Sequence, residues 1–505
     1  MTAPPYKQLE QEFRRVHAFR GAISLLRWDA AVMMPRGSAD IRGEQLAALE
    51  TEQHQLLTQP KITRLIDRAE ANTPALDDWQ IANLREMRRL RDLAIATPVS
   101  LISRLAVAVA RAEAAWLKAR ADNSFAVFAP HLEEILTLVR DKALLLGQAL
   151  SLSPYDALIS EFNPGVTGQD IDAAFKQLSR WLPGLVRDAL AQQETRPVLP
   201  LSGKFPTAKQ RPLAIEVMKA FGFPFDTGRL DESEHPFCEG VPGDVRVTTR
   251  FVPGDAFYGL LSAIHETGHA LYEVGLPSQW RTQPVGRDRG MALHESQSLF
   301  LEMLIGRSRA FAHWVQPLMV RHLGVSGPEW APDNLYAHLT RVRRSLVRVE
   351  ADEVTYPLHI LLRYELEKRL VSGTLAVKDL PEAWNSGMEQ RFGMRPRNDL
   401  EGCLQDIHWA WGAFGYFPSY ALGAMIASQL AEVLREDVPD FEEQVARGEF
   451  AAVAGWLREH VHAQGSRFTI QELMQEASGK PLSATALLRH LQARYLEGTP
   501  SSAAA

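Results

Sequence analysis

Apolar residues recur three and four positions apart along most of the chain, with charged residues between them, as in VSLISRLAVAVARAEAAWLKARA from Val99. This spacing matches the turn of an amphipathic helix. Helix starts are predicted where Thr97 precedes Pro98 and where Thr167 stands three residues before Asp170, because such residues satisfy the first amide groups of a helix. Most of the chain is therefore predicted to be α-helical.

Residues 227 to about 253 break this pattern. They are rich in glycine, proline and β-branched residues, and Val245 and Val247 alternate with Arg246 and Thr248. Alternation with a period of two predicts strands, so we expect a small hairpin or three-stranded sheet in a helical body. No linker rich in Pro, Gly or Ser divides the chain. We expect one α-rich unit over residues 1–505, with two helical lobes around a cleft as the main variant.

Charge and cysteine content exclude several classes of protein. The 505 residues include 55 basic and 61 acidic side chains, a net charge of −6, which gives no general attraction to nucleic acid or anionic membranes. Two cysteines, Cys238 and Cys403, cannot build a disulfide framework and favour a reducing compartment. We find no signal peptide and no transmembrane run. The sequence predicts a soluble, cytoplasmic protein.

The segment GLLSAIHETGHALYEVGLP contains an HExxH pattern formed by His265, Glu266 and His269. Residues four apart lie on one face of a helix, so both imidazoles can reach a single ion. Glu266 projects beside them, where it can act as a general base toward water. The flanking residues are apolar with helical spacing, as such a site requires. The sequence therefore predicts a metal site on this helix.

A catalytic metal of this kind needs a third protein ligand. Glu273 is unsuitable because it lies eight residues beyond His265, a rise of roughly 12 Å. The metzincin arrangement also fails, because Tyr272 occupies the position of its glycine and no third histidine follows on schedule.

The next helical segment, RGMALHESQSLFLEMLIGRS, offers two carboxylates, Glu295 and Glu302, seven residues apart on one face. We favour Glu295, because the adjacent His294 would then bring two histidine-rich segments face to face. Glu302 would be a partner of the ligands or a surface charge. Spacing alone leaves both alternatives open.

Taken together, these motifs are familiar. The set HETGH, HESQS, VRVEADEVTY and GCLQDIHWAWGAFGYFPSY, with HPFCEGVPGDVRVTTRF before it, resembles the thermostable carboxypeptidase (carboxypeptidase Taq) family of metallopeptidases. The resemblance implies that His265, His269 and Glu295 bind the metal and that Glu266 is the catalytic base. It also implies a mainly α fold with a deep central groove, similar to neurolysin and angiotensin-converting enzyme, and a homodimer. Members remove C-terminal residues from peptides one at a time, with broad side-chain tolerance.

A carboxypeptidase must recognise a free carboxylate near the scissile bond, and a guanidinium suits this task. Arg348 lies in SLVRVEADEVTYPLHI, which we predict to be helical. The alternative is a structural pair between Arg348 and Asp352, four residues apart on one helix face. The resemblance favours the role of Arg348 as the carboxylate receptor.

Developing negative charge on the scissile carbonyl needs a donor. The segment GCLQDIHWAWGAFGYFPSYALG offers His408, Tyr416 and Tyr420, although aromatic residues near helical spacing are more often part of a core. The resemblance indicates that this motif lines the groove, with His408 and Tyr420 as oxyanion and substrate contacts. Gln405 and Asp406 are expected to orient them, and Gln405 is also a candidate substrate contact.

Asp244, Arg246 and Thr248 match another motif of the family, on a strand beside the metal helix. If this strand lies at the edge of the sheet, it can bind an extended peptide backbone. The alternative is a salt-bridged strand packed on the helices. Cys238 stands nearby and is either a stray metal ligand or, as we favour, an ordinary buried residue.

The predicted activity is metallocarboxypeptidase cleavage of the last peptide bond by activated water. The ion is expected to be zinc, with cobalt or manganese as alternatives for the same ligands. One alternative function is an oligopeptidase that cleaves inside short peptides with the same metal chemistry. A second is a non-catalytic helical protein that binds peptides and holds a structural metal, although such sites are usually four-coordinate and rich in cysteine.

Overall fold

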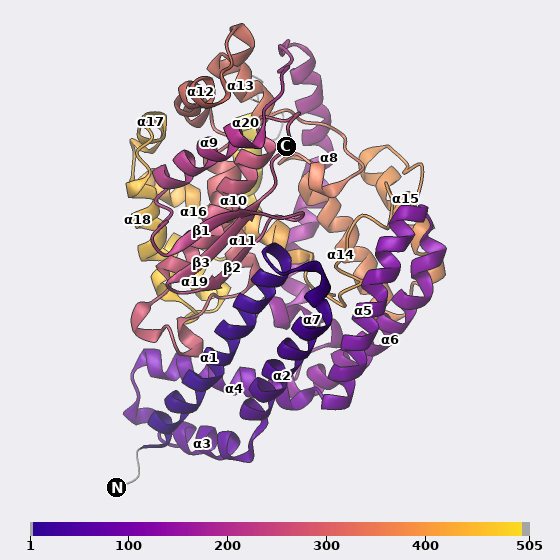
Figure 1. Cartoon of the computed structure of the whole chain (residues 1–505), viewed down its shortest axis with the longest axis vertical. Helices are drawn as coiled ribbons and strands as arrows, with labels where there is room; N and C mark the ends of the chain where they lie inside the picture. Colours follow the sequence, from indigo (N-terminus) through magenta and orange to yellow (C-terminus); the bar gives the residue numbers. More distant parts are fainter. Residues whose placement is uncertain (1–3, 497–505) are drawn as a thin grey trace.

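The computed structural model describes residues 4–496, and this part of the chain is mostly helical with one small sheet (Figure 1). The predicted fold class is confirmed. In chain order the α-helices are α1 (Pro5–Val32), α2 (Ala39–Thr58), α3 (Pro60–Glu70), α4 (Asp78–Ala96), α5 (Val99–Asp122), α6 (Phe125–Leu150), α7 (Pro154–Phe162), α8 (Gly168–Glu194), α9 (Thr207–Ala220), α10 (Tyr258–Gly275), α11 (Met291–Leu299), α12 (Arg309–Leu323), α13 (Pro332–Leu339), α14 (Tyr356–Ser372), α15 (Leu380–Phe392), α16 (Pro418–Asp437), α17 (Phe441–Arg447), α18 (Ala451–His460), α19 (Ile470–Ser478) and α20 (Thr485–Tyr495).

The two predicted helix starts have different outcomes. Thr167 caps α8 as predicted, because its hydroxyl accepts a hydrogen bond from the Asp170 amide and the Asp170 carboxylate accepts one from the Thr167 amide. The prediction that Thr97 caps α5 is wrong. Pro98 has an extended conformation with ψ of 143°, so it is the residue before α5 and not its first helical position.

The predicted β region forms a three-stranded sheet of β1 (Gly228–Glu232), β2 (Cys238–Val241) and β3 (Asp244–Thr249). Its strand order is β1-β3-β2, with β3 antiparallel to β2 and parallel to β1. The expectation that β3 lies at an edge is therefore wrong, because β1 pairs with the side of β3 that the β2–β3 hairpin leaves free.

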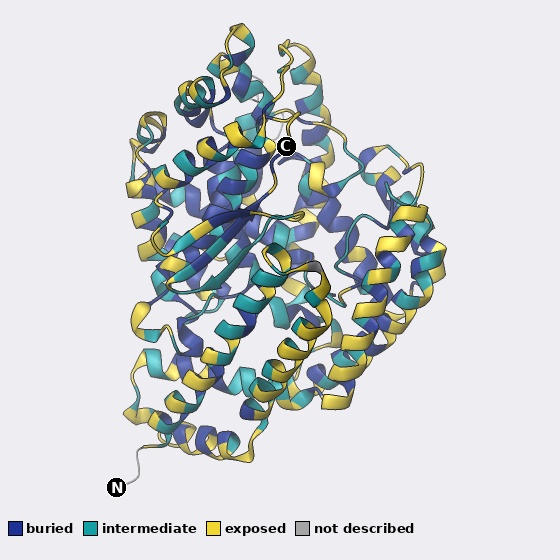
Figure 2. Cartoon of the chain, viewed as in Figure 1, coloured by how far each residue is buried: buried dark blue, intermediate teal, exposed yellow. Residues whose placement is uncertain are grey.

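Buried hydrophobic residues form one large cluster that extends from α5 to α20. A separate cluster belongs to α1, α3 and α4, and a third joins the sheet to α9 and α10. Figure 2 shows this buried interior around α10 and β3, while α2, α5 and α6 carry exposed faces. Helix α10 thus lies between the sheet and the main core, where its side chains can be held rigidly.

Close contacts between α10, α11 and α16 depend on two glycines. A Cβ atom at Gly268 of α10 would lie 2.3 Å from the carbonyl oxygen of Gln297 in α11. A Cβ atom at Gly423 of α16 would lie 2.8 Å from Cγ of Glu295. Such distances are far below van der Waals contact, so glycine at both positions allows α11 to approach its two neighbours.

Within residues 4–496, no single helix is long and apolar enough to span a membrane. Helices α4 and α5 reach that threshold only as a pair, and the chain bends by 78° between them.

Candidate metal centre and active site

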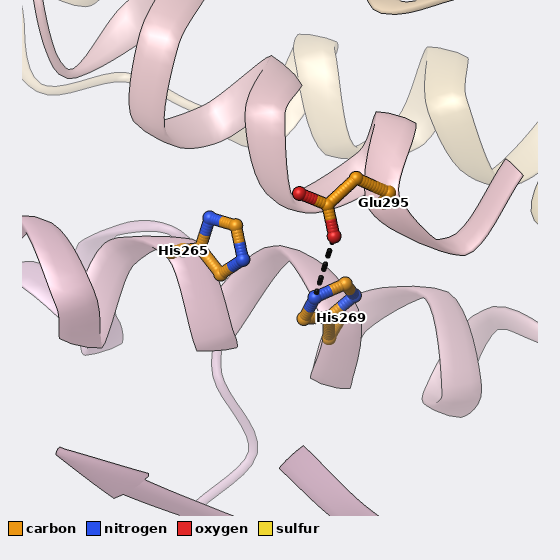
Figure 3. Close-up of side chains that lie close together, drawn as sticks. All are labelled: His265, His269 and Glu295. Carbon is orange, nitrogen blue, oxygen red and sulfur yellow. Dashed lines mark ion pairs between the residues drawn. The ribbon is translucent and has the colours of Figure 1, made fainter. Parts of the chain in front are cut away.

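Three side chains of the predicted metal site converge. His265 and His269 lie one turn apart on α10, and Glu295 reaches them from α11 (Figure 3). One potential ligand atom from each residue lies within 4.8 Å of the others. Nε2 of His269 is 3.7 Å from Oε2 of Glu295. Of the two carboxylates that spacing left open, Glu295 joins the histidines, because α11 packs directly on α10.

Glu302 supports the site from outside. It lies in a π-helical turn, Phe300–Ile305, that continues α11. Its Oε2 is 3.0 Å from Nδ1 of His265, and its Oε1 accepts a hydrogen bond of 2.6 Å from Nη2 of Arg307. A carboxylate bound to Nδ1 fixes the ring and leaves Nε2 free for an ion. The extra residue in a π-helical turn changes the directions of the side chains. The seven-residue spacing between Glu295 and Glu302 therefore does not predict where Glu302 points.

His269 is oriented in the same way by a second chain of contacts. Its Nδ1 lies 2.6 Å from Nδ1 of His294, whose Nε2 lies 3.1 Å from Oε1 of Glu273. When His269 donates to His294 and His294 donates to Glu273, Nε2 of His269 carries a lone pair toward Glu295. Glu273 thus supports the site without being a ligand, in agreement with its exclusion by helical rise.

Glu266 is buried beside the two histidines, with 6% of its surface exposed. Its Oε2 has no hydrogen-bond partner among the described residues. Burial raises the pKa of Glu266 to about 7; the positive charge of His265 opposes this rise and the negative charge of Glu295 adds to it. A buried carboxylate without a partner, with a pKa near neutrality, is suited to exchange a proton with water.

The donor set fits a divalent transition-metal ion. Two imidazole nitrogens and one carboxylate oxygen are ligands that zinc accepts, with a fourth position open for water or substrate. Among the described residues, these three side chains form a group that could hold a metal ion, and Cys238 is not part of it. Burial raises the pKa of Cys238 well above its usual value, so the thiol stays protonated.

Arg348 lies close to the candidate ligands but not in an α-helix. It begins a 3₁₀ turn, Arg348–Glu350, in the segment between α13 and α14. The helical prediction is wrong because Asp352 accepts hydrogen bonds from the Arg343 amide at 2.8 Å and from the Thr355 amide at 3.0 Å. Such local bonds compete with helix formation. They also mean that Asp352 is not the partner of Arg348.

The guanidinium of Arg348 is fixed by three neighbours. Its Nε donates to Asp406 at 2.8 Å, its Nη1 donates to the Tyr356 hydroxyl at 3.1 Å, and its Cζ lies 4.9 Å from the Tyr420 ring centroid. Among the described residues, none forms a hydrogen bond with Nη2. The charge of Arg348 opposes the rise that burial causes in the pKa of Glu295, so it acts at short range on the candidate ligand.

Asp406 is shared by two arginines. Its second oxygen accepts a bond of 2.6 Å from Nε of Arg363. Burial opposes ionisation of Asp406, yet Arg348 and Arg363 hold its pKa well below the usual range. Gln405 accepts from the Arg348 amide and from Nη2 of Arg363, and its own amide donates to Leu346 and Glu401 carbonyls. Since this saturates the side chain, Gln405 orients the arginines, and its predicted contact with substrate stays a prediction.

The aromatic motif is adjacent to this cluster. Nε2 of His408 lies 3.0 Å from the Tyr420 hydroxyl, and Nδ1 of His408 is buried without a partner. Burial lowers the pKa of His408 to about 3, and the charges of Arg348 and Arg363 contribute, so this imidazole is neutral. The ring centroid of Tyr416 lies 5.4 Å from those of both His408 and Tyr420. All three aromatic candidates therefore lie together.

The β3 candidates have protein partners. Arg246 donates to both oxygens of Asp244 at 2.9 Å, and its Cζ lies 4.3 Å from the Trp28 ring centroid of α1. Thr248 is fully buried, and its hydroxyl accepts hydrogen bonds from the Phe237 amide and from Ser233. Thr248 therefore holds the segment before β2, and its predicted contact with substrate stays a prediction.

Two residues near Arg348 were missed in the sequence. Tyr356 and Arg363 come from the same face of α14, seven residues apart, and both contact the Arg348–Asp406 pair. The signal was present: Arg363 directly follows the apolar residues 360–362, and an arginine in such a place indicates a buried ionic partner. It could not identify Asp406, which lies on a separate segment.

Known proteins resemble this chain over the residues that form this site. The family model described as carboxypeptidase Taq (M32) metallopeptidase matches residues 8–495. The chain belongs to this family. As a carboxypeptidase Taq family member, it is a metallocarboxypeptidase, and the resemblance seen in its motifs is confirmed.

Related members of the carboxypeptidase Taq family match over nearly their full length. Thermostable carboxypeptidase 1 of Pyrococcus furiosus is 36% identical over 493 residues, 97% of this chain and 98% of the relative. Carboxypeptidase 1 of Bacillus subtilis is 34% identical over 96% of this chain and 98% of its own. The structure of Trypanosoma cruzi metallocarboxypeptidase 1 superposes with a TM-score of 0.95 at 39% identity, over 97% of this chain and 99% of that one.

Proposed function

We propose that the protein removes single residues from the free C-terminus of peptides at the centre formed by α10 and α11. The observation that carries this proposal is the convergence of His265, His269 and Glu295 within 4.8 Å beside the buried, unpartnered carboxylate of Glu266. The proximity of a fixed guanidinium, that of Arg348, supports cleavage at a terminus.

His265, His269 and Glu295 would hold the metal ion. When bound, such an ion polarises the scissile carbonyl and lowers the pKa of the attacking water. Glu266 accepts a proton from that water at its free Oε2. It then returns the proton to the departing amine, because a group with a pKa near 7 can serve both steps at neutral pH.

Arg348 would receive the terminal carboxylate of the peptide through Nη2. Asp406 and Tyr356 occupy Nε and Nη1, so the guanidinium cannot rotate away from this orientation. A fixed charged donor loses little side-chain entropy when the carboxylate binds. The free C-terminus thus places the last peptide bond next to the metal ligands.

Tyr420 would donate its hydroxyl proton to the developing oxyanion. Neutral His408 can donate from Nε2 to the Tyr420 oxygen, which leaves the phenolic proton free to point elsewhere and agrees with the unpartnered Nδ1 of His408. We assign Tyr416 to the lining of the peptide site. Asp244 and Arg246 hold the shape of β3 next to β2, and we propose that β2, one of the two edge strands, pairs with an extended peptide.

Finer assignments rest on the family resemblance. We propose zinc as the native ion, with cobalt or manganese able to occupy the same donors. We also propose a cytoplasmic homodimer with broad tolerance for the terminal side chain. Metal analysis of the purified protein tests the first assignment, and light scattering during gel filtration tests the second.

Mass spectrometry of a peptide with a free C-terminus tests the proposed reaction. We expect a ladder of products, each shortened by one C-terminal residue. A chelator should stop the ladder, and added zinc, cobalt or manganese should restart it. Internal fragments, or an undiminished rate after the ion has been removed, would contradict the proposal.

A further inference from the structure

A small cavity lies between α1, the end of β2 and the segment that leads into α11. Its volume is about 30 Å³, room for about two water molecules. Basic side chains line it from two directions: His17 and Arg20 come from α1, and Arg281 and Arg287 come from the segment before α11. The backbone of β2 forms a further wall through Gly240.

Two of the three arginines at this cavity have no ion-pair partner among the described residues. In residues 4–496, neither Arg281 nor Arg287 has a carboxylate within ion-pair distance, and Nε of Arg287 is buried without a hydrogen bond. Arg20 has only a distant contact of 3.8 Å with Asp288. A partly buried guanidinium without a counter-charge is costly, so Arg287, with two exposed arginines beside it, favours a bound anion.

The two carboxylates in the cavity wall are too few to balance its three arginines. Glu273 is bonded to His294, and Asp288 accepts a hydrogen bond of 3.0 Å from the Gly290 amide. His17 contributes neither a negative nor a positive charge at neutral pH. Burial, followed by the charges of Arg287, Arg20 and Arg281, lowers the pKa of His17 to about 4. The three arginines outnumber the two carboxylates, so the cavity keeps an excess of positive charge at neutral pH.

The arrangement also gives an anion a route from solvent. The Arg20 side chain is 47% exposed and Arg281 is exposed, so both lie at the rim, whereas Arg287 lies deeper. We propose that this cavity binds one small monovalent anion of chloride size, held between Arg287 and the two rim arginines. Large organic anions do not fit the volume.

The bound anion joins two parts of the chain. Helix α1 approaches β2 closely, because the Ser24 hydroxyl donates to Glu239 at 2.7 Å. An anion between Arg20 and Arg287 would add to the contacts that α1 already makes with the segment before α11, such as the 3.0 Å hydrogen bond from Gln283 to the Glu10 carbonyl. We expect chloride to stabilise the folded protein by holding α1 in place, whichever peptide bond the enzyme cleaves.

Bromide provides a direct test because its anomalous scattering identifies it. Crystals of the metal-loaded enzyme soaked in sodium bromide should show an anomalous peak beside the Arg287 guanidinium. The peak should be absent from crystals of Arg287→Gln. No peak in the wild-type cavity, or an equal peak in the variant, would overturn the proposal.

Thermal unfolding tests the same site in solution. At constant ionic strength, replacing sodium gluconate by sodium chloride should raise the unfolding temperature of the metal-loaded enzyme along a saturating curve. Loss of one charged contact in Arg281→Gln should raise the half-saturating chloride concentration about tenfold. Arg14→Gln is the matched control, because Arg14 is an exposed arginine of α1 outside the cavity. Equal effects of gluconate and chloride, or an unchanged response in Arg281→Gln, would overturn the proposal.

Discussion

Glu266 is the residue on which the proposed chemistry depends most. In Glu266→Gln the shape of α10 is kept, but the group can no longer accept a proton. We expect turnover to fall by about 10²–10⁴-fold, with metal content unchanged because Glu266 is not among the three candidate ligands. Rate measurements paired with metal analysis check this outcome. Normal turnover by the metal-loaded variant would refute the assignment of the base.

At the scale of single residues, the sequence predicted what a side chain can do better than what it touches. The HExxH spacing brought His265 and His269 together because it follows from helix geometry alone. Gln405 and Thr248 were predicted to contact substrate, yet their hydrogen bonds are used within the protein. Their types suited both roles, and only the positions of distant segments decide between them.

At the scale of elements, the contact between α10 and α11 determines the metal site. In Gly268→Ala, the new methyl group would meet the Gln297 carbonyl at 2.3 Å, so α11 must move away and take Glu295 with it. We expect metal affinity to fall by at least tenfold, as measured by competition with a chelator. Gly455→Ala is the control, because that glycine of α18 has open space around its Cα. Equal affinities for wild type and Gly268→Ala would contradict this account.

Helix α20 braces the π-helical turn that carries Glu302. Arg494 donates to the Met303 and Leu304 carbonyls and to Glu353, and His490 lies 2.6 Å from the same carboxylate. Burial opposes ionisation of Glu353, yet the charge of Arg494 and the hydrogen bonds from His490 and Tyr495 hold its pKa below the usual value. Because folding lowers the pKa of Glu353, this carboxylate contributes fully to stability above its pKa in the unfolded chain. The contribution is lost as the pH falls below that value.

This network predicts a pH-dependent effect of Glu353→Gln. At pH 7 the variant leaves Arg494 with an uncompensated charge, so we expect a loss of about 3–5 kcal/mol. Below about pH 4, where the carboxyl of the unfolded chain is protonated, the difference from wild type should shrink. Urea unfolding at several pH values measures it. A difference that stays constant or grows toward acid pH would exclude this role of Glu353.

Elements with regular periodicity were predicted well, and those that depend on local hydrogen bonds were not. The segment of Arg348 has apolar residues at helical spacing, but Asp352 binds nearby amides and keeps it irregular. The position of β3 in the middle of the sheet also escaped prediction. Apolar and polar residues alternate in the same way in an edge strand and in a central strand. The pairing with β1 depends on a chain segment outside the β2–β3 hairpin.

At the scale of the whole molecule, the small sheet in a helical body was predictable from where the helical period stops and resumes. The full-length match to the family agrees with motifs spread along nearly the whole chain. A central groove, one undivided unit and a likeness to neurolysin and angiotensin-converting enzyme stay predictions. They concern the arrangement of helices, which periodicity does not encode.

The central claim is that the enzyme recognises the free C-terminus of a peptide through Arg348, which lies beside the metal centre. Two peptides identical except for a free or an amidated C-terminus test it most directly. Loss of one charged hydrogen bond corresponds to about 1.5–3 kcal/mol, or roughly ten- to a hundredfold in kcat/KM. We predict that the metal-loaded enzyme cleaves the free acid faster by at least the lower factor and shortens it one residue at a time. Equal cleavage of the amide would contradict the claim and favour an oligopeptidase.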